Sequence, residues 1–191
     1  MENPVINGLT ALEHPTQGIA DLMTIKEKKG SYQGLKICYS GNLYNVAYTT
    51  MIFCATLGID LSIACPKDIE PDKDILAEAQ RRAKATGAKI ELTQDFEEAL
   101  KDADIVYGMS QYSMGQSDEE IAFLKEAFKP YQITMDAMKK AKPDAIFMHC
   151  LPAHRGEEVT DEVMECSQSV IFDEGENRMH SIKAILAAVA N

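Results

Sequence analysis

The sequence predicts an α/β domain, a Rossmann-like three-layer sandwich whose central parallel sheet is flanked by helices. Short β-rich runs alternate with helical patterns of about ten to fifteen residues, which is typical of parallel sheets covered on both faces. The 191 residues are 46% hydrophobic and 26% charged, enough for one sizeable core. No repeat, low-complexity tract or Gly/Ser-rich linker divides the chain, so we expect one domain over residues 1–191.

The first elements alternate as such a fold requires. A helix is predicted from His14 to about Lys28, because apolar residues recur there at helical spacing and Pro15 falls in its first turn. The run LKICYS predicts a strand that ends near Gly41. A second helix is predicted from about Asn45 to Leu57, and Gly58 stops it.

The middle of the chain continues the alternation. DLSIAC reads as a buried strand, and a charged amphipathic helix from Pro71 to Thr86 follows it and stops at Gly87. AKIELT predicts the next strand, and a short helix is expected around Asp95 to Leu100.

The last third predicts two more strands. DIVYG is followed by a helix around Asp118 to Phe128, for which Ser117 and Glu120 form a plausible capping box. DAIFMH is the fifth strand. After acidic turns and the run SVIFD, a final helix is predicted from roughly Glu174 to Val189.

Composition excludes several classes of function. The formal charge of -11 opposes nucleic acid and anionic membrane surfaces. Neither a signal-like leader nor an apolar stretch of about 20 residues is present, so we expect a cytoplasmic protein. The five cysteines contain no C-x-x-C pair, which predicts reduced thiols and neither a disulfide framework nor a zinc site. No metal and no cofactor are expected.

Polar residues at the ends of strands are the candidate ligand contacts. Ligands of such sheets bind beyond the carboxyl ends of the strands, so the residues just past Tyr39, Tyr107 and Met148 should converge on one crevice. Only Gly41 is present where a dinucleotide site needs three glycines, which disfavours NAD.

Two of these strand ends carry open alternatives. Asn42 or Asn45 could cap the second helix, or Asn45 could offer a donor and an acceptor to a ligand. The stretch Ser113–Gly115, which includes Met114, could be an exposed loop that grips a ligand.

The third strand end, FMHCLPAHRGEE, joins several reactive residue types. His149 and Cys150 are neighbours in a strand, so they point to opposite faces and cannot pair as base and nucleophile. Cys150 is either a small buried residue or part of a binding rim. A cis bond before Pro152 would expose the Leu151 carbonyl to a ligand.

Three residues near the helix starts have similar alternatives. Arg178 is either a solvated surface residue or a site residue. His14 and Gln17 lie three residues apart on one helix face, at a helix start that favours anions.

The stretches HPTQ, DIVYG…SMGQ, HCLP and ENR, in this order, resemble the carbamoyltransferase family, and most closely its ornithine carbamoyltransferases. The resemblance covers nearly the whole chain. It implies the family's second, amino-acid-binding domain, with residues 1–30 forming a helix of the kind that joins it to the first. It also implies a place in arginine metabolism.

The resemblance implies roles for individual residues, with carbamoyl phosphate and an amine such as ornithine as substrates. His14, Gln17, Cys150, Leu151 and Arg178 would contact carbamoyl phosphate, with His14, Cys150 and Arg178 taking part in catalysis. Asn45, Ser113, Met114 and Leu151 would hold the amino acid. Direct attack of the amine on the carbonyl needs no covalent enzyme intermediate.

The sequence departs from the family in two respects. The domain with the family's phosphate loop is absent, so we expect the isolated chain to be inactive and to need that domain, in cis or in trans. Met109 stands where the ornithine enzymes carry an aspartate that meets the substrate's ammonium. Acceptance of a different amine and a non-catalytic ligand-binding or regulatory module are therefore the alternatives.

Overall fold

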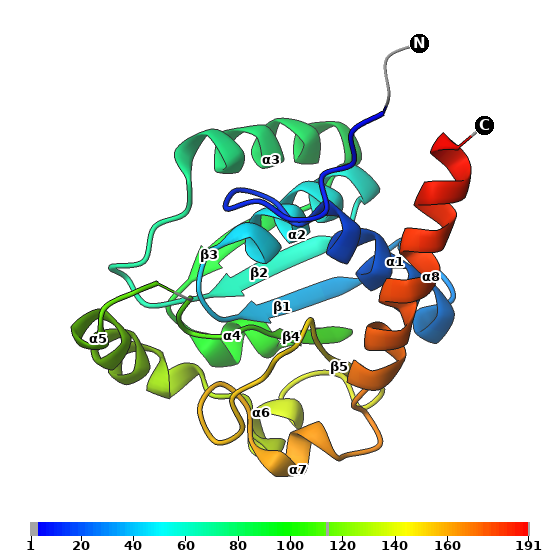
Figure 1. Ribbon diagram of the computed structural model, residues 1–191. Helices are drawn as coiled ribbons and strands as arrows, with labels where there is room; N and C mark the ends of the chain where they lie inside the picture. The colour runs from blue at the N-terminus through cyan, green and yellow to red at the C-terminus, as the bar shows by residue number, and fades with distance from the viewer. Residues whose placement is uncertain (1–3, 114, 191) are drawn as a thin grey trace.

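The computed structural model describes residues 4–113 and 115–190, so the prediction for Met114 lies outside the described residues. Five parallel strands form one sheet in the order β3-β2-β1-β4-β5 (Figure 1). The strands are β1 (Lys36–Ser40), β2 (Asp60–Ala64), β3 (Ile90–Thr93), β4 (Ile105–Gly108) and β5 (Ile146–His149). The predicted fold class is confirmed.

Helices cover both faces of this sheet. In Figure 1, α2 and α3 lie over one face with α1 and α8 beside them, and α4, α6 and α7 lie across the other. The helices are α1 (Pro15–Lys29), α2 (Asn45–Leu57), α3 (Lys73–Thr86), α4 (Phe96–Leu100), α5 (Asp118–Phe128), the 3-10 turn η1 (Lys129–Tyr131), α6 (Met135–Met138), α7 (Asp161–Met164) and α8 (Ile171–Val189). No helix in the described part of the chain is long and apolar enough to cross a bilayer.

Local signals set several helix boundaries where the sequence predicts them. Helix α2 ends at Gly58, whose left-handed backbone (φ 76°) lets its N–H donate to the Cys54 carbonyl. Helix α5 begins with the predicted capping box, in which Ser117 and Glu120 each accept from the other's backbone N–H.

The prediction that Asn42 or Asn45 caps α2 is wrong. The N-cap residue is Tyr44, and no side chain caps it. Asn42 Nδ2 instead donates to the Gln111 carbonyl at 2.7 Å, and Asn45 Nδ2 donates to the Thr10 carbonyl at 2.8 Å. Both amides therefore connect the start of α2 to neighbouring segments.

The last helix begins at Ile171, earlier than the predicted Glu174. Ser169 pairs with Phe147 through an isolated parallel bridge, and Val170 N–H donates to the Phe147 carbonyl at 3.0 Å. The segment paired with Phe147 ends at Val170, and α8 begins at the next residue, Ile171. Arg178 consequently lies two turns inside the helix, above buried Glu174.

The sheet order reverses direction between β1 and β4, and this point is where open α/β sheets bind ligands. Tyr39 and Tyr107, both fully buried, stack there with ring centroids 5.7 Å apart. The two strands that lead to the site are thus joined by packing as well as by backbone hydrogen bonds.

Candidate active site

The ends of β1, β4 and β5 converge, as the sequence predicts. Met109 N–H donates to the Ser40 carbonyl at 2.9 Å, and Asn42 bonds the Gln111 carbonyl. Cys150 Sγ lies 3.4 Å from Met109 Sδ. Segments that follow three different strands therefore meet at one edge of the sheet.

Three of the predicted site residues contact one another although they come from opposite ends of the chain. Arg178 on α8 donates from Nη1 to Gln17 Oε1 at 2.7 Å, and the same nitrogen lies 3.3 Å from His14 Nε2. The start of α1 is fixed because His14 N–H donates to Thr49 Oγ1 on α2 at 2.9 Å. Arg178 also lines a hollow of about 220 Å³ between α8 and the N-terminal segment.

His14 is held as a neutral imidazole. Partial burial lowers its pKa below the ordinary value, and the positive charge of Arg178 lowers the pKa further. Since a guanidinium only donates, His14 Nε2 is the acceptor of this contact and the imidazole proton is on Nδ1. The pair offers hydrogen-bond donors and one positive charge.

The stretch after β5 presents Cys150 and Leu151. The Leu151–Pro152 bond is cis, and Leu151 has a left-handed backbone (φ 57°). Leu151 N–H donates to His149 Nδ1 at 2.9 Å, so His149 carries its proton on Nε2, which lies 3.4 Å from the Glu158 carboxylate. Buried His149 and Glu158 thereby hold the turn that carries Leu151.

Burial raises the pKa of the Cys150 thiol well above its ordinary value, and the negative charges of Glu174 and Asp21 raise it further. A thiol in this state is not a nucleophile at neutral pH. We therefore expect iodoacetamide to alkylate Cys150 more slowly than Cys166, the other cysteine that is not fully buried. Peptide mass spectrometry after timed labelling measures both rates, and faster labelling of Cys150 would contradict this description of the thiol.

The predicted amino-acid contacts stand apart from this cluster. Asn45 is half-buried and bonded to Thr10, and exposed Ser113 donates its N–H to Gln116 Oε1 at 2.8 Å. Among the described residues, no hydrogen bond joins Asn45 or Ser113 to His14, Gln17, Cys150, Leu151 or Arg178.

Three buried residues that the sequence does not single out lie behind the cluster. Asp21, Tyr107 and Glu174 are each about 1% exposed or less, and Gln17 Nε2 donates to Asp21 at 2.7 Å. In the sequence, Asp21 and Glu174 are acidic residues inside amphipathic helices. That pattern does not show whether an acidic side chain is buried or exposed. Their placement depends on α1 and α8 meeting.

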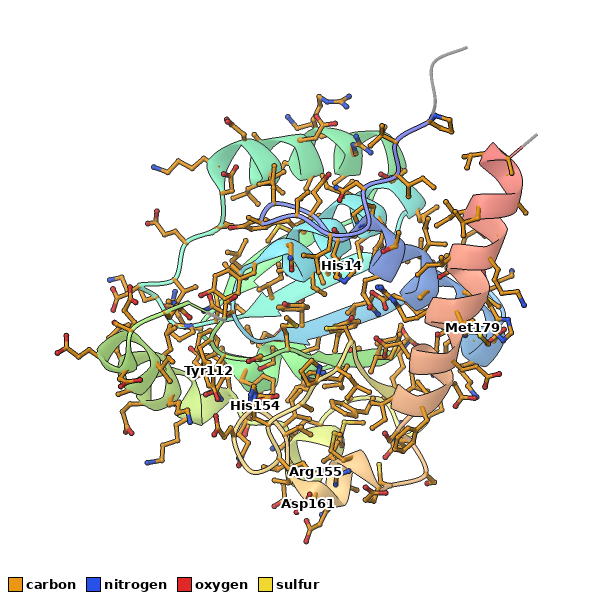
Figure 2. The ribbon with its side chains drawn as sticks, in the orientation of Figure 1. His14, Tyr112, His154, Arg155, Asp161 and Met179 are labelled. Carbon is orange, nitrogen blue, oxygen red and sulfur yellow. The ribbon has the colours of Figure 1, made fainter. Side chains whose placement is uncertain are left out.

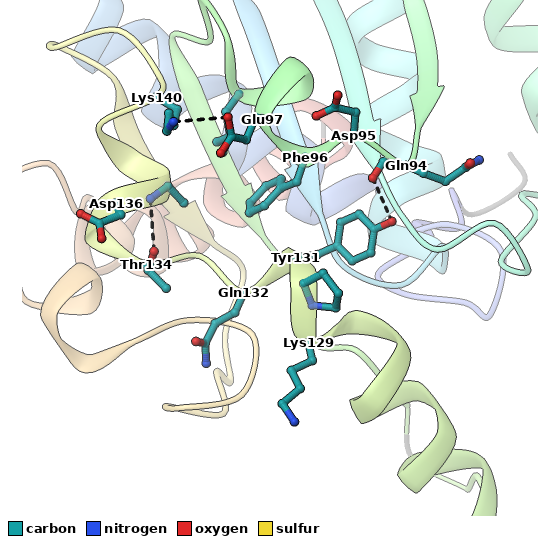
Figure 3. A pocket seen from close by; sticks show the side chains of 13 residues that line it. Gln94, Asp95, Phe96, Glu97, Lys129, Tyr131, Gln132, Thr134, Asp136 and Lys140 are labelled. Carbon is teal, nitrogen blue, oxygen red and sulfur yellow. Dashed lines mark hydrogen bonds and ion pairs between the residues drawn. The ribbon is translucent and has the colours of Figure 1, made fainter.

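A larger hollow and a group of polar side chains around His154 lie outside this cluster. A hollow of about 740 Å³ between α4, η1 and α6 shares no residue with the cluster (Figure 3). His154 packs on Tyr112, as Figure 2 shows, with ring centroids 5.0 Å apart. One atom each of His154, Glu157 and Glu158 that could bind a metal ion lies within 4.8 Å of the others. However, Glu157 pairs with Lys125 at 2.7 Å, and Glu158 accepts from the His154 N–H at 2.6 Å. One oxygen of each of these carboxylates is thus bonded within the protein.

Relatives with known names share this architecture. The ornithine carbamoyltransferase of Pyrococcus furiosus is 48% identical over 186 residues, and that of Caldicellulosiruptor saccharolyticus is 50% identical over 186 residues. The alignments cover 97% of this chain but only 59% and 60% of those proteins. A solved structure of the Pyrococcus furiosus enzyme superimposes with a TM-score of 0.91 over 96% of this chain and 58% of that one.

A family model gives the same assignment. The model described as "Aspartate/ornithine carbamoyltransferase, Asp/Orn binding domain" matches residues 33–189, which include β1, the whole sheet and Arg178. The converging strand ends lie within the matched residues, whereas His14 and Gln17 precede them. The chain therefore belongs to the aspartate/ornithine carbamoyltransferase family, of which it contains the Asp/Orn binding domain.

Proposed function

We propose that the chain is the substrate-binding half of a carbamoyltransferase, which moves the carbamoyl group of carbamoyl phosphate to an amine, with ornithine as the first candidate. The observation that supports this most is the contact of Arg178 with both Gln17 and His14, in which two acceptors at the start of α1 hold a cation of α8, a helix from the other end of the chain. The names of the relatives support the choice of ornithine.

The proposed chemistry is a direct transfer. The neutral amine attacks the carbonyl carbon, the bond from that carbon to the phosphate oxygen breaks, and the proton that the nitrogen loses passes to the departing phosphate. Negative charge grows on the carbonyl oxygen during attack, and the Arg178 guanidinium, held in place by Gln17 Oε1 and His14 Nε2, provides donors to stabilise it. The protonated Cys150 thiol and the Leu151 carbonyl are assigned to the carbamoyl nitrogen and the amine, and positioning supplies much of the acceleration.

The acceptor is assigned to the loops after β1 and β4. Asn45 offers an amide and Ser113 a hydroxyl, and Met114 belongs to the same proposed set. Asn45 Nδ2 donates to the Thr10 carbonyl in this structure, so it must exchange that carbonyl for the substrate. Ser113 bonds Gln116 through its backbone N–H and not through its hydroxyl. We place the acceptor between these loops and Leu151.

A second domain completes the proposed site by binding the phosphate, in cis or in trans. The chain spans about 59% of the length of the Pyrococcus furiosus relative. Apolar side chains of the N-terminal segment, α1 and α8 are exposed, among them Leu9 (62%), Ile19 (44%) and Leu186 (53%). Where such side chains gather in a patch, they are typical of domain or subunit contacts. Residues 1–30 are the proposed connecting segment.

Phosphate release tests this function. The chain, alone and then with a carbamoyl-phosphate domain supplied, is mixed with carbamoyl phosphate and a panel of amines that includes ornithine and putrescine. We expect release above background only with the domain present, and with one preferred amine. Release by the chain alone would contradict the need for a second domain. Binding of an amino acid without turnover in either sample would instead identify a non-catalytic module.

Met109 is the residue that argues for a different amine. Its thioether lies against Cys150 and cannot accept a charged hydrogen bond from an α-ammonium. We expect Met109→Asp to increase affinity for α-amino acids by about 10- to 100-fold, as a hydrogen bond between charged groups typically provides. Calorimetric titration measures the change in the complete enzyme, by which we mean this chain together with the proposed carbamoyl-phosphate domain. Met109→Leu controls for packing. No gain with aspartate would exclude this position as the ammonium contact.

A further inference from the structure

Two carboxyl groups from distant parts of the chain meet in the interior between α1 and α8. Gln17 Nε2 donates to Asp21 Oδ1 at 2.7 Å and to Glu174 Oε1 at 3.2 Å. The Tyr107 hydroxyl lies 3.2 Å from Asp21 Oδ2 and 3.3 Å from Glu174 Oε1. Because two groups are each shared by both acids, the carboxyls are neighbours, and each residue is 1% exposed.

Two ionised carboxylates that share the same two partners would repel each other strongly in a buried site. Burial raises the pKa of Asp21 to about 6, and burial together with the Asp21 charge raises the pKa of Glu174 well above its ordinary value. The groups that act on the pair include Tyr107 on β4, Tyr39 on β1, Cys54 on α2 and Cys150 after β5, all neutral near pH 7 because burial raises each pKa.

Arg178 is a cation whose charge lowers the pKa of Asp21, against the effect of burial. It does not bond either acid directly but donates to Gln17 Oε1, while Gln17 Nε2 bonds the acids. The acids therefore fix which end of the Gln17 amide faces Arg178. One negative charge on the pair would balance the guanidinium, two would leave an excess buried charge, and none would leave Arg178 uncompensated.

Glu174 also reaches the other half of the proposed site. Its Oε2 accepts the His149 backbone N–H at 2.9 Å, next to Cys150. The pair thus connects α1, which carries His14 and Gln17, and α8, which carries Arg178, to the end of β5.

We propose that Asp21 and Glu174 hold one proton between them and act as a positioning pair, whose single negative charge orients Gln17 and Arg178 against the end of β5. Neither acid touches the proposed substrates, so the pair acts through its neighbours. The proton-sharing part is independent of the proposed function, and the positioning part rests on it.

Infrared spectroscopy of the chain tests the shared proton without any activity. A protonated carboxyl absorbs apart from carboxylates, and labelling glutamate with carbon-13 shifts the band of a protonated glutamate. At pH 7.5 we expect such a band in the wild-type chain and its loss in Glu174→Gln. Asp173→Asn, which removes an exposed carboxylate one residue away, is the control and should retain it. Absence of the band in the wild-type chain, or its persistence in Glu174→Gln, would overturn the proposal.

A double-mutant cycle in the complete enzyme tests positioning. Asp21→Asn and Glu174→Gln each leave one carboxylate, so each single change should lower kcat/KM by less than about tenfold. The double variant has no charge to balance Arg178, and its loss should exceed the product of the single losses by about tenfold or more, the coupling that contacting residues show. If the loss of kcat/KM in the double variant equals the product of the two single losses, and its circular dichroism spectrum is that of the wild type, then Asp21 and Glu174 do not act together through one shared charge.

The two tests separate the possible failures. If the complete enzyme has no carbamoyl-transfer activity, the proposed function fails while the infrared result still decides the shared proton. If activity is normal and the infrared band is absent, the pair fails and the function stands.

Discussion

Arg178→Gln should abolish most of the proposed carbamoyl-transfer activity of the chain combined with a carbamoyl-phosphate domain, while leaving the fold intact. The glutamine removes the positive charge and the Nη1 donor, which lies 2.7 Å from Gln17 Oε1 and 3.3 Å from His14 Nε2. Removing one donor to a developing oxyanion costs about 10²–10³ in kcat. Steady-state phosphate release with saturating carbamoyl phosphate and ornithine measures this loss, which should appear mainly in kcat because the charge develops during attack.

A matched control distinguishes this role from a general effect of charge. Arg81 lies on α3 with an exposed side chain that pairs with Glu78, and exposed pairs contribute only about 0–1 kcal/mol. Arg81→Gln should therefore keep kcat within about twofold. Arg178→Lys keeps the charge but not the guanidinium, and its kcat should fall between the two. A kcat for Arg178→Gln close to that of Arg81→Gln would remove Arg178 from the catalytic step.

The fold was predictable because its signals are local. Helix α2 is bounded by a glycine, and α5 begins with a capping box that four consecutive residues contain. The error at α8 has a non-local cause: Ser169 pairs with Phe147, which is 22 positions earlier, and this bridge decides where the helix begins. The capping prediction for Asn42 failed for the same reason, since Gln111 competes for its side chain.

The site was predictable only in part. The convergence of strand ends follows from the topology of parallel sheets, and the motifs around His14, Cys150 and Arg178 identify the family. Asp21 and Glu174 carry no such signal, because each is a common helix residue whose burial depends on the packing of α1 against α8. Pairing of two acids separated by most of the chain is a property of the tertiary structure.

Gly41→Ala should be the most destabilising single methyl addition at the site. Gly41 has φ 148°, a conformation that side chains rarely adopt, and a Cβ there would lie 2.5 Å from the Met109 carbonyl oxygen and 2.6 Å from Met109 Cβ. Backbone strain of about 1–3 kcal/mol and overpacking of about 1–3 kcal/mol add to a loss of about 2–6 kcal/mol in the free energy of unfolding. The close approach of these two loops sets the separation of the β1 and β4 ends, so amine binding should weaken as well.

Urea denaturation measures the loss in the free energy of unfolding, with Gly175→Ala as the control. A Cβ at Gly175 on α8 meets nothing within 4 Å, so this alanine should stabilise the helix by up to about 1 kcal/mol. Equal unfolding free energies for Gly41→Ala and the wild-type chain would mean that the two loops do not touch in solution.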